Sequence, residues 1–302
     1  MFKIFILAFL SIFYKPVEPV KSSLQNTNKP LIIMAAPVGI NGWSLNIKGN
    51  IVPTNREEFI MESNKLVHLG ASVIHIHPVS KAPVFRNNYF DFSLKNYTEI
   101  TKKIREVNPD LCFDWCIEYS NDSINLFQKS LYNPLFGSMH EFIGGKNYNG
   151  INIPAPSVEN EILRFNKAYK HGVRLFPVIK SRNDVENLKL ILAKAFVTEP
   201  VVAIFHFSGG EKLEPTKHNF IAIRDLLPDF VKEVIIVCEG KNWRQTAEIA
   251  IENNFHVRVG LHESDEKITN SEFVKYCVAK ANEYNRSVAT PFQAKHLLGY
   301  LK

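Results

Sequence analysis

The sequence predicts a single α/β domain built as a closed (β/α)₈ barrel, the TIM-barrel architecture. From residue 30 onward, short apolar runs alternate with longer amphipathic segments, and eight such pairs follow one another. The apolar runs are nearly continuous, which is typical of parallel strands buried on both faces. No Gly-x-Gly-x-x-Gly turn follows the first run, so the alternative, an open doubly wound sheet, is disfavoured.

The elements follow from hydrophobic spacing in chain order. In the first helix, Phe59, Ile60, Leu66 and Leu69 recur at helical intervals. The expected strands cover residues 31–38, 72–77, 111–117, 135–139, 173–179, 201–207, 233–238 and 257–261. The expected helices cover residues 55–69, 94–107, 123–131, 158–169, 185–196, 219–227, 243–252 and 272–283. A chain of 302 residues accommodates these units as one catalytic domain over residues 30–302.

Residues 1–29 are set apart from this pattern. Lys3 precedes an apolar run over residues 4–14, the outline of a signal peptide, but no small-x-small cleavage site follows. The run is also short for a membrane span. We expect residues 1–29 to be a leader outside the fold of a cytoplasmic enzyme; export or membrane tethering is the alternative.

Charge and cysteine content narrow the function classes. The net charge is +6, but lysine and arginine are spread along the chain without a basic run, which argues against a nucleic-acid partner. The excess positive charge suits an acidic substrate or a nucleotide-bearing one. The four cysteines form no C-x₂-C pair, so reduced thiols are expected.

A histidine pair closes the second expected strand. A barrel of this class places its active site at the carboxyl ends of its strands, where His75 and His77 fall. Side chains two residues apart share one face of a strand, so both imidazoles can reach one ion. Neutral imidazole is a good zinc ligand, and the pair therefore predicts a metal site. Two hydrogen-bonded core histidines are the alternative explanation.

The last strand supplies a candidate third ligand. Arg258 and His262 share one face by the same alternation, whereas Glu263 points elsewhere unless the strand ends before it. Three histidines with an open position form the pattern of a catalytic zinc site. Arg258 lies deeper, where it can hold a carboxylate in a bidentate fork or form a structural ion pair. Glu263 is a candidate partner for Arg258 or an acid/base group, and if a bulge in the strand turns it inward, it is the alternative third ligand.

Other strand ends offer candidate substrate contacts. Cys116 ends the third strand, where a small buried thiol is favoured over a nucleophile. Ser138 is placed at the end of the fourth strand. Gly209 and Gly210 follow the sixth strand, and their backbone N–H groups can cradle an anion or simply turn the chain.

In combination these segments resemble the β-keto acid cleavage enzymes, a family typified by 3-keto-5-aminohexanoate cleavage enzymes. The signature Gly-Ala-x-x-x-His-x-His appears at residues 70–77, and the resemblance extends from about residue 31 to residue 299. Further segments similar to the family are residues 31–39, 257–261, 270–274 and 289–295. The ordered combination is specific, although each segment alone is a weak signal.

The resemblance implies a zinc-bound barrel that converts a β-keto acid and acetyl-CoA to acetoacetate and a new acyl-CoA. It implies zinc on His75 and His77, with Arg258 on the substrate side, and an assembly of identical subunits, expected to be a tetramer. The family's third ligand is a glutamate in a Gly-Leu-Glu-Asp run. His262 stands at that position here, and Glu263 stands at the position of the aspartate.

Four more positions bear on substrate recognition. The family has an arginine after its second histidine, where this chain has Pro78, and a glutamate where this chain has Asn41. A family serine matches Cys116, and a threonine roughly matches Ser138. The metal-binding scaffold therefore transfers from the family better than the identity of the substrate does.

Overall fold

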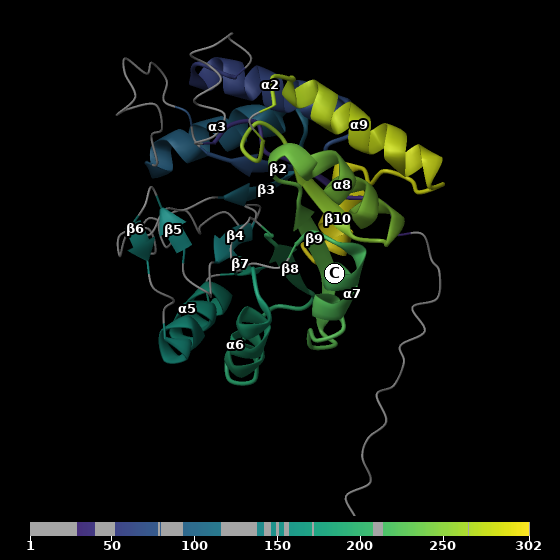
Figure 1. Cartoon of the computed structure of the whole chain (residues 1–302). Coiled ribbons are helices and arrows are strands. Elements are labelled where there is room, and N and C mark those ends of the chain that lie inside the picture. The colour runs from purple at the N-terminus through teal and green to yellow at the C-terminus, as the bar shows by residue number, and fades with distance from the viewer. Residues whose placement is uncertain are drawn as a thin grey trace, which may run out of the picture.

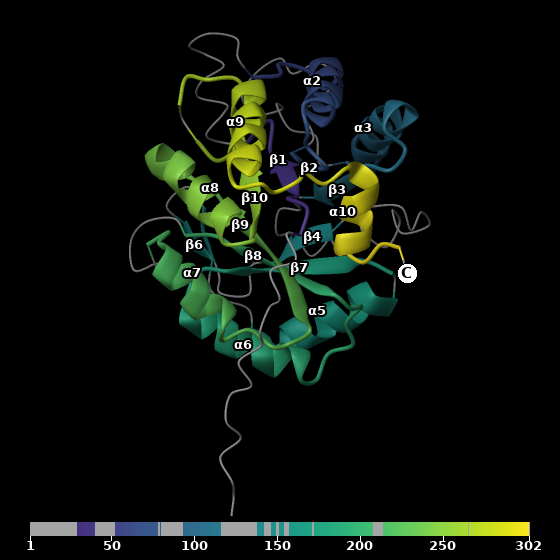
Figure 2. The same ribbon diagram turned by 90° about the vertical axis from the view of Figure 1, so that its right-hand side faces the viewer.

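The computed structural model of the chain describes residues 29–39, 52–77, 79, 93–115, 138–141, 146–148, 151–153, 157–170, 172–207, 214–264 and 266–301, with the backbone alone for the three short segments between 138 and 153. Eight parallel strands close into a barrel in the order β1-β10-β9-β8-β7-β4-β3-β2. Helices surround the barrel on its outside (Figure 1), and Figure 2 shows the ring they make around the strands. The predicted closed barrel is thereby confirmed.

The barrel strands are β1 (Ile33–Ala35), β2 (Val73–Ile76), β3 (Cys112–Trp115), β4 (Ser138–Glu141), β7 (Arg174–Ile179), β8 (Val201–Phe205), β9 (Val231–Val237) and β10 (His256–Val259). The helices are α2 (Arg56–His68), α3 (Leu94–Val107), α5 (Val158–Lys170), α6 (Arg182–Leu192), α7 (Lys217–Arg224), α8 (Trp243–Glu252), α9 (Asn270–Glu283) and α10 (Pro291–Leu297), with a 3₁₀ turn η2 (Gly240–Asn242) before α8. None of the described helices is long and apolar enough to cross a membrane.

Several elements are shifted by a few residues from their expected bounds, such as α6, expected over residues 185–196 and observed over Arg182–Leu192. Other differences change the set of elements or the place of a candidate residue. Strand β4 covers Ser138–Glu141 instead of 135–139, so Ser138 is its first described residue rather than near its end. A short antiparallel hairpin, β5 (Lys146–Tyr148) with β6 (Ile151–Ile153), was not predicted. Helix α10 was not predicted either. The helix expected over residues 123–131 lies outside the described residues.

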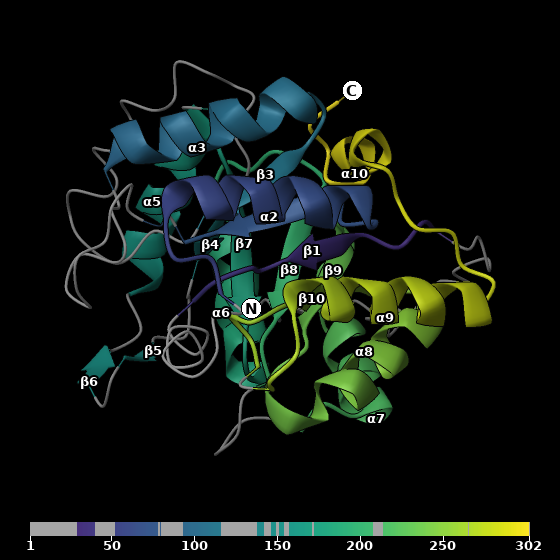
Figure 3. The same ribbon diagram turned by 90° about the horizontal axis from the view of Figure 1, so that it is seen from above.

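Local signals explain where the helices begin. Helix α9 starts at Thr269, whose side chain accepts from the Glu272 N–H, while the Glu272 carboxylate accepts from the Thr269 backbone. The same capping box, made by Ser181 and Asp184, starts α6. Each box satisfies backbone donors that have no partner inside the helix. Figure 3 shows α9 beside α2, with α3 on the other side of α2.

The apolar core has two layers, because strand residues alternate between the two faces of the barrel wall. Ile33 and Ala35 of β1 pack outward against the helices, while Ile32 and Met34 point into the barrel. Ala294 and Leu298 belong to the same interior cluster, so α10 and the residue after it cover the amino-terminal end of the barrel. Polar side chains lie at the carboxyl-terminal end of the barrel, which is called the mouth below.

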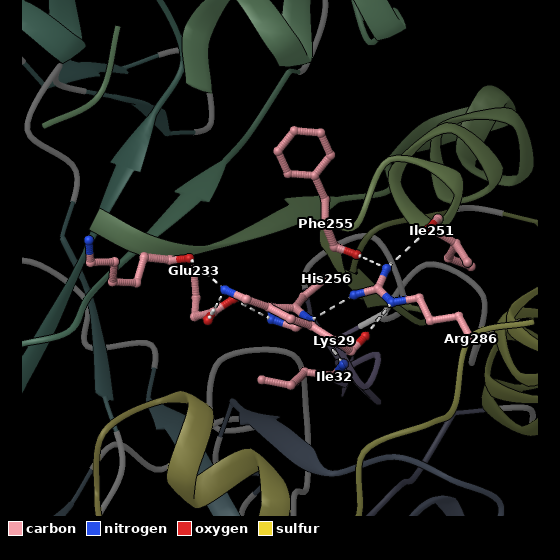
Figure 4. Close-up of polar contacts among 8 residues, drawn as sticks. Lys29, Ile32, Glu233, Ile251, Phe255, His256 and Arg286 are labelled. Atoms are coloured by element: carbon pink, nitrogen blue, oxygen red, sulfur yellow. Dashed lines mark hydrogen bonds and ion pairs between the residues drawn. The ribbon is translucent and has the colours of Figure 1, made fainter. Parts of the chain in front are cut away.

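A buried polar network, called the base network below, lies at the amino-terminal end of β9 and β10 (Figure 4). His256 Nε2 lies 3.0 Å from Glu233, and its Nδ1 accepts from the Ile32 N–H at 3.0 Å. Arg286 donates to the Lys29 carbonyl at 2.8 Å, and the Lys29 ammonium binds Glu233 at 2.8 Å. Lys29, which the sequence places in the leader, thus contacts the barrel; the leader role of residues 1–28 stays a prediction.

Candidate metal centre

His75 is fixed by the register between β2 and β3. Its Cα partner on β3 is Asp114, and both side chains point into the barrel. His75 Nδ1 lies 2.6 Å from Asp114 Oδ2, and both groups are almost completely buried. A carboxylate that accepts from Nδ1–H fixes the ring orientation and the tautomer, so that Nε2 is the nitrogen with a lone pair.

His77 follows the last residue of β2 and lies beside His75 as alternation predicts. The two ring centroids are 5.1 Å apart. His77 is also buried, and its ring lies 4.4 Å from that of His262. The shared face of β2 therefore presents two imidazoles to the mouth.

His262 reaches the same point because β10 ends abruptly. Gly260 has a φ of 143°, and a Cβ there would collide with the backbone of Ala36 on the neighbouring β1. The chain then turns, and the His262 N–H donates to the Ala36 carbonyl at 3.1 Å. A Cβ at Gly39 would overlap the His262 imidazole, so a glycine at residue 39 leaves the room that this ring fills.

Together the three histidines form a donor set. One nitrogen from each of His75, His77 and His262 lies within 4.8 Å of the other two. The rings of His75 and His262 are nearly parallel, at 3°, with centroids 5.2 Å apart. Three imidazoles suit zinc and its transition-metal neighbours and leave a coordination position open. The arrangement is therefore compatible with one divalent metal ion.

Beside the three histidines lies a buried ion pair. Arg258 Nη2 lies 2.7 Å from Glu263 Oε1, and both side chains are 3% exposed. Glu263 points inward because the chain turns after β10, which also brings its Oε1 to 3.9 Å from His262 Nε2. Burial raises the pKa of Glu263 to about 7, while the Arg258 guanidinium opposes that shift. Of the roles expected for Glu263, the structure shows the partner of Arg258. Although Glu263 points inward, its carboxylate is grouped with His206 and Glu239 and not with the three histidines, so its role as an alternative third ligand stays a prediction.

Sequence reasoning missed three polar residues of the mouth. Asp114 lies in an apolar stretch, although alternation places it on the same face as the candidate Cys116. His206 and Glu239 follow β8 and β9, and His206 Nε2 lies 3.0 Å from Glu239 Oε1. Their positions just past apolar strands are the same signal that pointed to His75 and His77.

The remaining predicted residues lie largely outside the described part of the chain. Cys116, Gly209 and Gly210 are not described, and only the backbone of Ser138 is. Asn41 and Pro78, where the chain departs from the family pattern, are also outside the described residues. The substrate contacts expected of Cys116, Ser138, Gly209 and Gly210 stay predictions.

The fold is a closed (β/α)₈ barrel whose mouth brings together three histidines in an arrangement compatible with one divalent metal ion. The chain belongs to the β-keto acid cleavage enzyme family, whose model matches residues 30–300. Because the family consists of enzymes, the same match shows that this protein is an enzyme. The match includes β1 through α10 and therefore every described residue of the site.

Two curated relatives support the assignment. A 3-keto-5-aminohexanoate cleavage enzyme of Acetoanaerobium sticklandii is 25% identical over 264 residues, covering 83% of this chain and 92% of that protein. A protein of the same name from Fusobacterium nucleatum is 24% identical over 264 residues, covering 83% of this chain and 92% of that protein.

Solved structures agree on the fold. The ObcA complex with oxaloacetate has a TM-score of 0.61 at 12% identity, covering 83% of this chain and 68% of that one. A phospho-2-dehydro-3-deoxyheptonate aldolase from Thermotoga maritima has a TM-score of 0.52 at 12% identity, covering 87% of this chain and 72% of that one.

Proposed function

We propose that the protein is a zinc-dependent β-keto acid cleavage enzyme that converts a β-keto acid and acetyl-CoA to acetoacetate and a new acyl-CoA. Family membership over residues 30–300 supports cleavage of a β-keto acid. The observation that carries the metal dependence is the convergence of one nitrogen from each of His75, His77 and His262 within 4.8 Å.

In this proposal the three histidines hold the ion, which supplies Lewis acidity towards a keto oxygen. Asp114 orients His75 and increases its basicity as a ligand. His262 replaces the family's glutamate ligand, so the ligand set is one unit more positive and polarises a bound carbonyl more strongly. Zinc suits this all-nitrogen set, in which no hard oxygen ligand takes part.

Arg258 and Glu263 are the proposed catalytic pair. The guanidinium supplies a positive charge at the mouth that suits the carboxylate of a β-keto acid, and Glu263 holds it in place at 2.7 Å. A carboxyl group with a pKa near neutrality is also suited to carry a proton. Cys116, Ser138, Gly209 and Gly210 are proposed to contact the rest of the substrate.

The all-histidine donor set also favours a second candidate function. Three neutral imidazoles and an open position are the ligands with which zinc activates water for hydrolysis. Another metal-dependent lyase or hydrolase is therefore a further candidate. A diverged barrel that binds a metal or a carboxylate without turnover is the remaining alternative.

One assay separates these functions. The purified protein is incubated with acetyl-CoA and each member of a panel of β-keto acids, and acetoacetate and acyl-CoA are measured by mass spectrometry alongside metal analysis. We expect one zinc per chain and turnover of at least one acid. His77→Ala should lose both, whereas His256→Gln, in the base network, should keep the metal. Zinc-loaded protein that cleaves no β-keto acid would exclude the leading proposal.

We also propose a homo-oligomer, in line with the tetramer that the family resemblance implies. Tyr169 and Phe196 support it: their rings lie 5.8 Å apart on the outer surface, and their exposed fractions are 47% and 66%. Adjacent exposed aromatic rings are typical of contact surfaces. Light scattering coupled to size exclusion tests the mass, and a monomer at micromolar concentration would contradict the proposal.

A further inference from the structure

A second polar group lies at the mouth beside the three histidines. His206 follows β8 and Glu239 follows β9, and His206 Nε2 lies 3.0 Å from Glu239 Oε1. Their side chains are 16% and 19% exposed, so the pair is sheltered but within reach of a small molecule. One oxygen of Glu263 lies within 4.8 Å of both ligand atoms, which places Glu263 between this pair and His262.

The backbone holds this pair in a defined place. The His206 N–H donates to the Ile179 carbonyl at 2.9 Å, which continues the pairing of β7 with β8. On either side of Glu239, the Cys238 N–H donates to Arg258 and the Gly240 N–H donates to Glu263, both at 3.0 Å. Both side chains are thus positioned by the barrel wall rather than by long loops, as precise chemistry requires.

Charges from every neighbouring strand act on His206. Burial is the largest influence and lowers the pKa of His206; Glu239 on β9 opposes that shift, while Arg258 on β10 and Lys180 after β7 reinforce it. The ring is therefore neutral near pH 7. Because its Nε2–H donates to Glu239, its Nδ1 carries the lone pair. Glu239 would offset the charge of the ring once Nδ1 takes up a proton.

The charge balance favours a proton-carrying role over a second metal ion. A dication on the three histidines and the Arg258 guanidinium carry three positive charges, against at most three negative charges on Asp114, Glu239 and Glu263, and the raised pKa of Glu263 lowers that number near pH 7. The Arg258 guanidinium already lies 2.7 Å from Glu263. A second dication would have to displace it and would leave uncompensated positive charge in a sheltered site, which is costly.

Resting on the proposed function, we propose that His206, positioned by Glu239, is the base that takes a proton from the α-carbon of the β-keto acid. The C–H bond breaks, a bond from the proton to Nδ1 forms, and the electron pair enters the enolate of the substrate. The α-carbon of the enolate attacks the acetyl carbonyl of acetyl-CoA, so a carbon–carbon bond forms and the thioester C–S bond breaks with release of the CoA thiolate. The thiolate then adds to the β-keto carbon, and the bond between the α- and β-carbons breaks to give the new acyl-CoA. The electron pair of that bond enters the enolate of acetoacetate, whose α-carbon takes the proton back from Nδ1. The step therefore needs no additional reactant.

The test uses the full-length, zinc-loaded protein and four variants: His206→Gln, Glu239→Gln, Glu239→Asp and, as a matched control, His218→Gln on the exposed face of α7. Wild-type turnover is established first with the acid selected by the panel. We then measure kcat, KM, the pH profile of kcat/KM, zinc content and deuterium uptake at the α-carbon of the acid in heavy water.

We expect His206→Gln to lower kcat roughly 10²–10⁴-fold, with KM little changed, and to lose the acid limb of the pH profile and the catalysed deuterium uptake. Zinc should stay at one per chain. Glu239→Gln should lower kcat and shift that limb, Glu239→Asp should restore most of the activity, and His218→Gln should match wild type. Restoration of activity to His206→Gln by added imidazole would separate a missing base from a misfolded barrel.

If His206→Gln turns over the acid as fast as the wild type does, with the same pH profile and the same deuterium uptake, the inference is overturned. The proposed function would stay intact. Two zinc ions in the wild type, with one lost in His206→Gln, would overturn it in favour of a second metal site. No turnover by the wild type would overturn the proposed function, and this inference with it.

Discussion

A polar cluster lies at each end of strand β10, the base network around His256 at one end and the three histidines His75, His77 and His262 at the other. The two clusters differ in how their polar groups are arranged. In the base network, His256 has a defined partner on each ring nitrogen, Glu233 on one side and the Ile32 N–H on the other. Arg286 donates to the carbonyls of Lys29, Ile251 and Phe255. The network ties together segments far apart in the chain.

The three-histidine cluster at the mouth has a different organisation. His75, His77 and His262 each bring one ring nitrogen within 4.8 Å of the other two. Such convergence adds little to the stability of the fold, and it makes sense as a set of ligands for a cation. The comparison shows that burial and residue type alone do not identify a functional histidine; the direction of its nitrogens does.

The sharpest test of this difference is Arg286→Ala in the base network. It removes the Arg286 donor from the carbonyls of Lys29, Ile251 and Phe255. The Ile251 carbonyl still accepts from the Asn254 N–H, whereas each loss at the other two costs about 1–3 kcal/mol. We expect the free energy of unfolding at pH 7 to fall by roughly 3 kcal/mol or more, measured by urea denaturation, with zinc content of the folded fraction unchanged. Arg224→Ala, which loses an exposed pair with Asp225 and a contact of its guanidinium with the Phe255 ring, should cost about 1 kcal/mol or less. Equal losses in the two variants would contradict the assignment.

Asp114→Asn, at the mouth, should change zinc binding, whereas Arg286→Ala should change stability. The asparagine amide is neutral and is a weaker acceptor for the His75 Nδ1–H than the Asp114 carboxylate. Zinc affinity should therefore fall about 10–100-fold, as measured by competition with a chelator. Glu233→Gln makes the matching change beside His256 and should leave zinc affinity unchanged. If both variants bind zinc like the wild type, the link between Asp114 and the metal is wrong.

Gly39→Ala probes the space that His262 occupies. The added Cβ overlaps the His262 ring, and relieving such an overlap costs roughly 1–3 kcal/mol, part of which should appear as weaker zinc binding. Gly172→Ala is the control, because a Cβ there meets no atom within 4 Å, although its φ of 69° adds backbone strain. It should lower stability without changing zinc affinity. Calorimetric titration with zinc distinguishes the two.

The smallest expected effect is a pH dependence of stability that originates in the base network. Burial lowers the pKa of His256 from its ordinary value of 6.5, so below that pH the unfolded chain binds more protons than the native one. Stability should therefore fall as the pH drops below 6.5, and again below 4.5 through Glu233, whose pKa is lowered mainly by His256 against the effect of its own burial. In His256→Gln the first decrease should be smaller, as followed by unfolding at pH 7, 6 and 5. An identical pH profile would show that His256 is not responsible.

Much of the fold was predictable because barrel strands and helices leave a local record. Helices α3 and α8 match their expected bounds, since their apolar spacing and neighbouring turns are both clear. Thr290, Pro291 and Gln293 form a start signal for helix α10. The helix was missed because it is only seven residues long. The shifted start of β4 shows how weakly a short apolar run defines its own ends.

At the site, alternation along one strand predicted the pairing of His75 with His77, a property of neighbouring residues. The inward direction of Glu263 depended on the turn at Gly260, whose φ of 143° no strand pattern predicts. The contact of Asp114 with His75 depended on the register of two strands that lie 39 residues apart in the chain.

The sequence by itself determined the repeating strand–helix order, the two-layered core and the histidines at one strand end, because period and alternation are local properties of the chain. Only the tertiary structure decided how far each strand is displaced along its partner and where β10 gives way to a turn. These are global properties, since closing the barrel sets every register at once. They brought His262, Asp114 and the pair of His206 with Glu239 to the same mouth as His75 and His77.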